Sequence, residues 1–483
     1  MTATAVDCRT DLFINNAWVP ARSGERFDVI NPATEDVIAE VARADAADVD
    51  AAVAAARACF ESDAWRGLSP RDRGKLLARA ADLLQERLKD IARLETLHNG
   101  KPLFESKIDL TMAAETLRYY AGWCDKLTGE TLPVSGAFFA YTRREPIGVV
   151  GAIVPWNFPL NLATWKFAPA LAAGCTVVLK PATETPLTAL AVAEVMHDAG
   201  FPPGAFNVIP GGGRTAGTAL VRHPGVDKIA FTGSTEVGKQ IMRDAAETVK
   251  RVTLELGGKS PNIIFADADI PSAIRGAQNG IFYGKGEVCA AGSRLLVERS
   301  IHDQVVEQLI ERTQKLVPGD PLAKGTRLGA VVSKGQQETV MLYIEAGKQE
   351  ATLVAGGHTA TVDGKGYFVE ATVFDGAKPG MKIVDEEIFG PVLAVMTFDD
   401  EEEAVRLANE TEYGLAAGIW TRDIRKAHRT AHAIQAGTVW INTYNFYDPA
   451  APFGGYKASG FGRDLGREAL GGYLEHKTVW VAL

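Results

Sequence analysis

At 483 residues the chain is too long for one ordinary hydrophobic core, and its length predicts about three domain-sized units. Its net charge of −9, from 51 basic and 60 acidic residues, argues against a nucleic-acid binder, which needs a basic surface for phosphate contacts. The five cysteines are scattered and form no CxxC pair, and the eight histidines show no metal-ligand spacing, so we expect no metal site and a reducing compartment, the cytoplasm.

The first long elements of the chain are predicted helices. An alanine-rich segment at 48–60 predicts one helix. In residues 74–100, apolar side chains recur at helical spacing from Leu77 to Leu94, and Asn99-Gly100 ends the pattern. This periodicity predicts a single amphipathic helix over that range.

The segment from 147 to 178 has Lys166 as its only charged residue and is long enough to suggest a membrane span. Its middle, however, contains the turn-forming residues Pro155, Asn157, Pro159 and Asn161. The sequence therefore predicts a core strand, a loop and a core helix, with no membrane segment.

Residues 149–256 alternate short β-branched runs with helical segments, which predicts a parallel sheet covered on both faces. Such sheets bind ligands at the carboxyl ends of their strands. A second alternating region begins at 261 and predicts another α/β domain. Two pieces fit neither domain: residues 138–150 are typical of an exposed hairpin, and 478–483 of a strand with no later partner. Because a free strand commonly pairs with another chain, both pieces indicate an oligomer.

Several residues at the ends of the predicted strands are candidates for binding and catalysis. Glycine-rich turns at 210–217 and 231–239 are natural seats for a phosphate, although plain strand-to-helix turns look the same. Lys180 ends a strand, where it can bind a nucleotide ribose or simply face solvent. The Asn157 amide can hold an oxyanion or satisfy its own turn. Glu255 also ends a strand, where burial raises the pKa of a carboxyl toward that of a general base; an ion pair is the alternative.

Cys289 lies in the loop "GKGEVCAAGSR" at 284–294. Free cysteine is among the most buried residue types, so simple packing is one interpretation. A nucleophilic thiolate needs nearby positive charge or helix N-terminal amides. Lys285 would lower the pKa of the thiol and Glu287 would raise it, so this segment by itself leaves both interpretations open.

Together these residues resemble the aldehyde dehydrogenase superfamily along essentially the whole chain. The resemblance rests on nine segments in the family's order: "VPWNFPL", "VVLKPA", "FTGSTEVGK", "LELGGKSPNII", "GEVCAAGSR", "EEIFGPV", "NETEYGLAAGIWT", "GTVWIN" and "PFGGYKASGFGRDLG". It implies an α/β fold with two parallel-sheet domains, one of them Rossmann-like, and a small β oligomerisation arm. The implied boundaries are a dinucleotide-binding domain of 1–124 and 147–256, a catalytic domain of 257–450, and an arm of 125–146 and 468–483.

The resemblance also implies a reaction, the oxidation of a small-molecule aldehyde to a carboxylic acid with NAD(P)⁺. Cys289 would attack the aldehyde to give a thiohemiacetal, and the Asn157 amide with the Cys289 N–H would hold its oxyanion. Loss of hydride would leave a thioester, and Glu255 would activate the water that hydrolyses it.

The implied binding residues form two groups. The cofactor contacts are Ile153, Pro155, Trp156, Lys180, Thr183, Gly213, Gly217, Phe231, Gly233, Ser234, Val237, Leu256, Glu387 and Phe389. The substrate-tunnel residues are Met112, Phe158, Trp165, Phe446 and Phe453. The cofactor is expected to be NAD, although Thr183 stands where NAD-preferring relatives often carry glutamate, which leaves NADP possible. The aromatic tunnel favours an apolar aliphatic or aromatic aldehyde, with an aminoaldehyde or betaine aldehyde as the alternative.

Other positions depart from the family or concern its assembly. "YGKGE" at 283–287 stands where relatives often show Asn-Gln-Gly-Gln, and Asp464 replaces a common glutamate thought to assist proton relay. Arg251, Arg463 and Glu475 match a charged cluster at the family's subunit interface, so a homodimer or homotetramer is expected. The rival functions are a cysteine-dependent esterase and a nucleotide-binding relative without activity.

Overall fold

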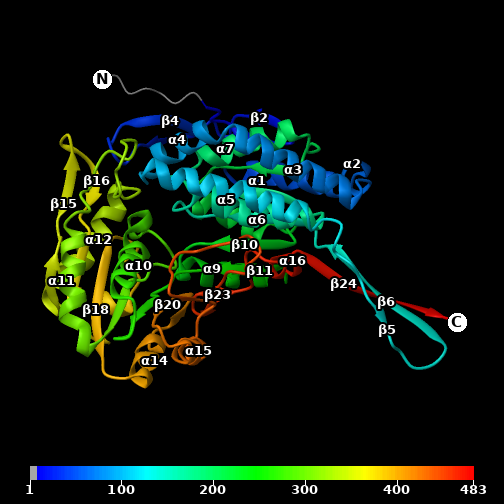
Figure 1. Cartoon of the computed structure of the whole chain (residues 1–483). Helices are drawn as coiled ribbons and strands as arrows, with labels where there is room; N and C mark the ends of the chain where they lie inside the picture. Colours follow the sequence, from blue (N-terminus) through cyan, green and yellow to red (C-terminus); the bar gives the residue numbers. More distant parts are fainter. Residues whose placement is uncertain (1–7) are drawn as a thin grey trace.

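The computed structural model describes residues 8–483, which form two large mixed sheets, their covering helices and a projecting arm (Figure 1). The first sheet has eight strands in the order β2-β1-β9-β8-β7-β10-β11-β23. Its strands are β1 (Leu12–Ile14), β2 (Ala17–Val19), β7 (Val149–Ile153), β8 (Thr176–Lys180), β9 (Phe206–Val208), β10 (Lys228–Thr232), β11 (Arg251–Glu255) and β23 (Gly460–Phe461).

The five central strands of the first sheet, β9 to β11, are parallel, and antiparallel strands close both edges. The order reverses between β7 and β10, which is the switch point where such sheets bind ligands. The prediction of a parallel sheet from 149–256 is confirmed for these strands. The sequence did not predict β1, β2 or β23, which lie outside the alternating region of 149–256.

Helices bury both faces of this sheet. Alternate side chains of β7 separate accordingly, with Val150 and Ala152 in one hydrophobic cluster and Val149 and Ile153 in another. One face is covered by α3 (Pro70–Glu86), α4 (Leu88–Asn99), α5 (Leu103–Ala121), α6 (Pro159–Ala173) and α7 (Leu187–Ala199). The other is covered by α1 (Ala46–Glu61), α8 (Thr218–Arg222) and α9 (Thr235–Ala246), with the short α2 (Asp63–Arg66) following α1 and a π-helix, η1 (Gly213–Gly217), preceding α8.

Two expectations about these helices have a clear outcome. The single helix predicted over 74–100 is wrong: α3 and α4 are separate, because Arg87 between them leaves helical geometry at φ −92° and ψ 7°. The break lets both helices pack against α5 and α7. The predicted core helix after the proline-rich loop is α6, every residue of which is buried. Within the described residues, none of the helices has the length and hydropathy of a membrane span.

The second sheet has seven strands in the order β14-β17-β18-β13-β12-β20-β21, of which only β14 is antiparallel to its neighbour. Its strands are β12 (Pro261–Ile264), β13 (Arg294–Glu298), β14 (Thr352–Ala355), β17 (Thr372–Asp375), β18 (Val392–Phe398), β20 (Ala416–Trp420) and β21 (Thr438–Ile441). Its helices are α10 (Ile270–Phe282), α11 (His302–Thr313), α12 (Lys334–Glu350), α13 (Lys382–Asp385), α14 (Glu401–Asn409) and α15 (Ile424–Ala433).

The remaining short strands, one short helix and two 3₁₀ turns lie outside the two large sheets. They are β3 (Arg26–Ile30), β4 (Val37–Ala42), β15 (Thr359–Val362), β16 (Lys365–Val369), β19 (Tyr413–Gly414), β22 (Tyr456–Lys457), α16 (Glu468–Gly471) and the 3₁₀ turns η2 (Tyr283–Gly286) and η3 (Arg299–Ile301).

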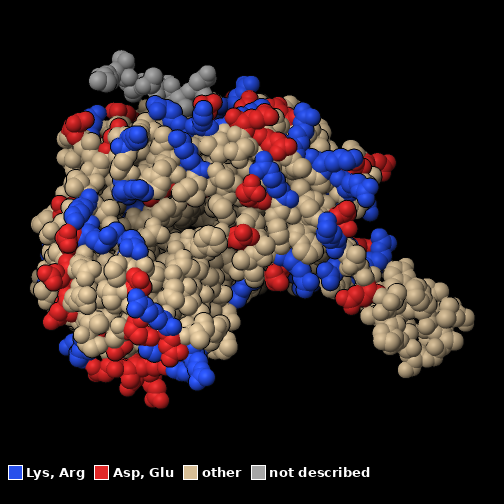
Figure 2. All heavy atoms as spheres, in the orientation of Figure 1, with Lys and Arg blue, Asp and Glu red and all other residues tan. Residues whose placement is uncertain are grey.

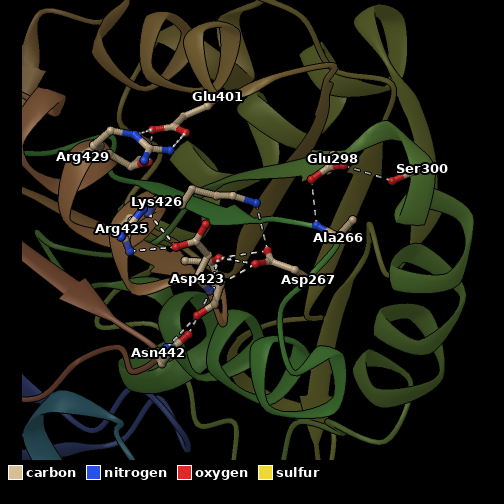
Figure 3. A network of polar contacts seen from close by, with 12 residues as sticks. Ala266, Asp267, Glu298, Ser300, Glu401, Asp423, Arg425, Lys426, Arg429 and Asn442 are labelled. Carbon is tan, nitrogen blue, oxygen red and sulfur yellow. Dashed lines mark hydrogen bonds and ion pairs between the residues drawn. The ribbon is translucent and has the colours of Figure 1, made fainter.

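The carboxyl edge of the second sheet is filled by its own polar side chains (Figure 3). Asp267, just after β12, accepts hydrogen bonds from Thr421 Oγ1, the Asp423 main-chain N–H and Lys426 Nζ. These contacts hold the end of β20 and the start of α15 against β12. The loop that carries Cys289 instead leads into β13, at the opposite, amino edge of this sheet.

The arm is a three-stranded antiparallel sheet in the order β24-β6-β5 that projects from the body (Figure 1). Its strands are β5 (Thr131–Leu132), β6 (Phe138–Pro146) and β24 (Leu474–Ala482). Two expectations are corrected here. The hairpin is formed by β5 and β6, while residues 149 and 150 belong to β7. The C-terminal strand has a partner in its own chain, because β24 pairs with β6 along its whole length.

Candidate active site

Cys289 lies in the wall of a cavity of about 730 Å³. The cavity is bounded by α5, α6, α10, α11 and the loop at 445–453. Figure 2 shows a hollow between the helical upper part and the left-hand part of the molecule, where α5 and α10 approach each other in Figure 1. All five predicted tunnel residues line the same cavity as Cys289: Met112, Phe158, Trp165, Phe446 and Phe453. Phe446 is 70% exposed.

The backbone around Cys289 is tightly fixed. Gly284, Lys285 and Gly286 are three consecutive residues with φ of 57°, 61° and 72°, so the chain turns sharply before the cysteine. A Cβ on Gly258 would lie 2.5 Å from the carbonyl oxygen of Cys289, which only glycine avoids. The segment that follows β11 therefore packs directly on the cysteine, and Glu255 ends that strand.

The Cys289 thiol is surrounded by groups that disfavour its charge. Burial raises the pKa of the thiol well above its usual value, and the Glu255 and Glu387 carboxylates raise it further. Lys285 does not act as a free cation beside the thiol, because its ammonium pairs with Glu287 at 2.8 Å. Without an unpaired cation beside it, the thiol is therefore neutral at pH 7.

Glu255 is 3% exposed at the end of β11. Neither of its carboxylate oxygens has a hydrogen-bond partner in the described part of the chain. Burial raises the pKa of this carboxyl well above its usual value, while Lys166 lowers it and Asp464 and Glu387 raise it. Lys166 forms a buried ion pair with Asp464. An unpaired buried carboxylate is costly, which is the setting of a group with a chemical task.

Asn157 is 4% exposed, and its Nδ2 donates a hydrogen bond to the main-chain oxygen of Glu287 at 2.9 Å. A primary amide has two N–H groups, so one remains for another acceptor. Glu287 is two residues before Cys289. The amide is therefore tied to the loop that carries the cysteine.

The predicted cofactor residues gather at the carboxyl ends of the first sheet's strands. Ile153 ends β7, and Pro155 and Trp156 follow it; Lys180 ends β8; Phe231 is in β10; Gly233 and Ser234 follow β10; Val237 is in α9; Leu256 follows β11; Gly213 and Gly217 bound η1. Glu387 and Phe389 come from the loop before β18, and the Phe389 ring lies 5.2 Å from that of Trp156.

These residues fit a dinucleotide. Lys180 is 4% exposed, its ammonium donates to the Pro181 carbonyl, and a Cβ on Gly217 would be in van der Waals contact with Lys180 Cε at 3.4 Å, so Gly217 and the lysine side chain lie side by side. Ser234 caps α9 by accepting from the Val237 N–H, and the start of a helix favours a phosphate. Burial raises the pKa of Glu387 to about 7, while the Gly258 N–H stabilises its charged form.

Thr183 donates a hydrogen bond to the carboxylate of its neighbour Glu184 at 3.1 Å. Burial lowers the pKa of Lys180 to about 8, and Glu184 opposes this shift. A carboxylate is thus present one position after Thr183, which sequence reasoning about Thr183 alone did not consider.

Sequence reasoning missed the charged groups of the cavity. Glu105 and Asp109 line it together with Met112, and their spacing along α5 places all three on one helix face, a signal the periodicity contained. Burial raises the pKa of Glu105 to about 8, and Asp109 is paired with Lys101 at 2.6 Å.

Three arginines also line the cavity: Arg275, Arg312 and Arg327. Arg275 donates to Ser272, Arg312 donates to Gln278, and Arg327 lies over the Phe104 ring. Within residues 8–483, none of the three forms an ion pair with a carboxylate. They come from segments far apart in the sequence, so no local pattern indicated them.

The three residues that match the family's subunit-interface cluster make different contacts within this chain. Arg251 and Glu475 form an ion pair within the chain, with contacts of 3.0 and 3.2 Å. Arg463 instead donates to the main-chain oxygens of Gly455 and Gly462.

Comparisons with known proteins identify the family of this chain. A family model described as "Aldehyde dehydrogenase family" matches residues 18–479. The human mitochondrial aldehyde dehydrogenase is 50% identical over 97% of this chain and 91% of its own length. The NAD⁺ complex of an aldehyde dehydrogenase from Bacillus cereus is 51% identical with a TM-score of 0.98, covering 99% of this chain and 98% of that one.

A second similar structure is the P. syringae AldA indole-3-acetaldehyde dehydrogenase, 47% identical with a TM-score of 0.97, covering 99% of this chain and 97% of that one. The likeness thus extends over nearly the whole length of each of these proteins. The chain belongs to the aldehyde dehydrogenase family, and it is an oxidoreductase that oxidises an aldehyde to an acid.

Proposed function

We propose that the protein oxidises an apolar aliphatic or aromatic aldehyde through a thioester on Cys289. The observation that most supports this is that Cys289 lines the cavity, while the Asn157 amide bonds the main chain two residues before it and the unpaired Glu255 carboxylate is near enough to raise the pKa of the thiol. Each of the three groups has the chemical capacity that one step of the reaction needs.

In the proposed mechanism, the Cys289 thiol loses its proton to water and its sulfur bonds to the aldehyde carbon. The free N–H of Asn157 and the main-chain N–H of Cys289 hold the resulting alkoxide oxygen. A dinucleotide held by Lys180, Ser234 and Glu387 would supply the acceptor for the hydride that this carbon loses. The Cys289 thioester remains and must then be hydrolysed.

Glu255 completes the cycle by taking a proton from a water molecule. The water oxygen adds to the thioester carbon, the bond from carbon to sulfur breaks, and the carboxylic acid leaves. The raised pKa of Glu255 makes its carboxylate a stronger base toward water than an ordinary glutamate, and the Lys166 ammonium favours its ionised form while Asp464 opposes it. The sum is aldehyde, NAD(P)⁺ and water giving acid, NAD(P)H and a proton.

For the cofactor, the proposed ligands are Lys180 for the adenosine ribose, Ser234 and the first turn of α9 for phosphate, and Glu387 for the nicotinamide ribose. We propose that NAD is preferred and NADP accepted. Thr183 itself carries no charge to repel a 2′-phosphate, whereas the carboxylate of Glu184 lies next to it.

For the substrate, the cavity charges argue against a cationic aldehyde. Its two acidic residues are neutralised, Glu105 by its raised pKa and Asp109 by Lys101, while three arginine side chains line the same cavity. The similar P. syringae protein is named for an aromatic aldehyde. A betaine aldehyde dehydrogenase from Staphylococcus aureus is 42% identical, so a cationic substrate is the alternative to test.

We also propose a homodimer or homotetramer in the cytoplasm, where a reactive thiol stays reduced. Support for assembly comes from the arm, whose outer end in Figure 2 carries no charged side chains. Its exposed hydrophobic residues include Phe138, Phe139 and Trp480.

The test is initial-rate kinetics at 340 nm with hexanal, phenylacetaldehyde and betaine aldehyde, each with NAD⁺ and NADP⁺. We expect kcat/KM for the two neutral aldehydes to exceed that for betaine aldehyde by roughly tenfold or more, from one unfavourable charge contact. Higher kcat/KM for betaine aldehyde would overturn the substrate proposal. Ester hydrolysis without any NAD(P)H formation would favour the esterase instead.

The same experiment tests the cofactor preference with the variant Thr183→Glu. A carboxylate there should lower kcat/KM for NADP⁺ by about tenfold or more through charge repulsion, with little change for NAD⁺. Equal changes for both cofactors would contradict the proposed place of Thr183.

A further inference from the structure

The loop before Cys289 contains a buried ion pair. Lys285 and Glu287 are 2% and 1% exposed, and Lys285 Nζ lies 2.8 Å from Glu287 Oε2. These charges stand where the resembled relatives often have neutral glutamines. A buried ion pair is weak evidence for stability, because the loss of hydration offsets its attraction. Its contacts indicate a different role.

Lys285 reaches the end of α4. Its ammonium donates to the Asn99 main-chain oxygen at 3.0 Å and to Asn99 Oδ1 at 2.8 Å. Asn99 Nδ2 in turn donates to the main-chain oxygen of Trp156 at 2.8 Å. Through Asn99, Lys285 therefore holds the backbone of the residue just before Asn157.

Glu287 contacts Asn157 from the other side. Its main-chain oxygen accepts the Asn157 amide, and its Oε1 accepts the Val332 N–H at 3.0 Å. Because Asn157 follows Trp156, the contacts form a closed ring: Trp156 to Asn99, Asn99 to Lys285, Lys285 to Glu287, and Glu287 to Asn157.

The backbone of Lys285 agrees with a role beyond packing. Its φ of 61° is a left-handed conformation that non-glycine residues rarely adopt. Such conformations persist when surrounding contacts impose them, and they are enriched at functional sites. Here the turn directs the ammonium to both Asn99 and Glu287.

We propose that Lys285 and Glu287 are positioning residues for the Asn157 amide, which rests on the oxyanion role proposed for Asn157 above. One amide N–H is held by the Glu287 carbonyl, and this fixes the direction of the other. The ion pair keeps that carbonyl in place, while Asn99 fixes the backbone of the neighbouring residue.

The test separates oxyanion chemistry from the reactivity of the thiol and needs no cofactor. Cys289 acylation by p-nitrophenyl acetate passes through an oxyanion, whereas its alkylation by iodoacetamide does not. Lys285→Gln and Glu287→Gln should each slow the acylation burst by about 10- to 100-fold, a part of what loss of a whole oxyanion donor costs. Alkylation should stay within about threefold of the wild-type rate. Acylation at the wild-type rate, or an equal loss in both reactions, would overturn the proposal.

The double variant Lys285→Gln/Glu287→Gln is the control in case the single variants misfold, because it leaves no unpaired buried charge. It should acylate faster than either single variant, since two amides can restore the ring. A double variant no faster than the singles would count against the ring. Lys426→Gln is the matched control: it breaks an ion pair of the second sheet at 3.2 Å and should acylate like wild type.

A double-mutant cycle with Asn157→Ala identifies the residue through which the pair acts. If Glu287→Gln works by orienting Asn157, it should slow acylation no further in the Asn157→Ala background. Multiplied losses would refute the positioning role while leaving the Asn157 role intact. An Asn157→Ala protein that acylates at the wild-type rate would instead refute the oxyanion role itself.

Discussion

At the scale of single residues, the surroundings of Cys289 and Glu255 both disfavour negative charge. Burial and the Glu255 and Glu387 carboxylates raise the pKa of the thiol, and burial raises the pKa of Glu255. Two neighbouring acids in such a setting do not both ionise at neutral pH. The cofactor-free protein should therefore have a poorly reactive thiol at pH 7.

This has a direct consequence for the pH dependence of Cys289. Because the pKa of the thiol is raised, most of the thiol is protonated at neutral pH. As the pH rises toward that pKa, the thiolate fraction increases about tenfold with each pH unit. Alkylation of the cofactor-free protein by iodoacetamide should thus accelerate by about tenfold between pH 7 and 8. Peptide mapping, with Cys289→Ala as control, assigns the modified residue. A rate constant independent of pH over this range would mean that the thiolate is already formed.

At the scale of elements, polar contacts join neighbouring strands and a helix of the second sheet where its strands end. Asp267 joins the ends of β12 and β20 to α15, and Thr421 and Lys426 lower the pKa of its carboxyl against the effect of burial. The charged form of Asp267 is therefore the one that stabilises the fold. Its contribution is present above the pKa of an unfolded aspartate and is lost as the pH falls through the lower, folded value.

Asp267→Asn should lower the melting temperature at pH 7 by about 2 °C, because a partly exposed, charged hydrogen-bond acceptor contributes about 1 kcal/mol. Differential scanning calorimetry at pH 7 and pH 3 checks this. The difference between variant and wild type should shrink at pH 3. A larger difference at pH 3 than at pH 7 would contradict the assignment.

The central strands were predictable from the sequence because β-branched runs between helices repeat with a clear pattern. The break at Arg87 was not, since arginine is an ordinary helix former and only packing decides that α3 ends there. The pairing of β24 was missed because its partner, β6, precedes it by more than three hundred residues. The same reason hid the contact of Lys285 with Asn99, which joins residues far apart in the chain.

At the scale of the whole molecule, the candidate site lies where the carboxyl edge of the first sheet meets the amino edge of the second. Glu255 comes from the former and Cys289 from the latter. The candidate site was predictable because its residues stand in short motifs at these edges. The arginines of the cavity were not, because only the folded chain brings their three segments together.

The exposed apolar side chains of the arm lead to a prediction about assembly. Phe139→Glu/Trp480→Glu should reduce the wild-type dimer or tetramer to smaller species, because each substitution places a charge in a proposed apolar interface. Light scattering coupled to size exclusion measures the mass. Lys477→Gln, at the base of the arm in an exposed ion pair with Glu145, is the control and should leave the mass unchanged. A monomeric wild type would contradict the oligomer.

The central claim is that Cys289 carries the acyl group and that Glu255 removes it. The most direct measurement is intact-protein mass spectrometry of Glu255→Gln after mixing with NAD⁺ and hexanal, alongside NADH absorbance. We predict one NADH per site followed by turnover slowed by about 100-fold or more, with a mass gain of one hexanoyl group that maps to Cys289. NADH formation at the wild-type steady rate, or an acyl group on any other residue, would contradict the account.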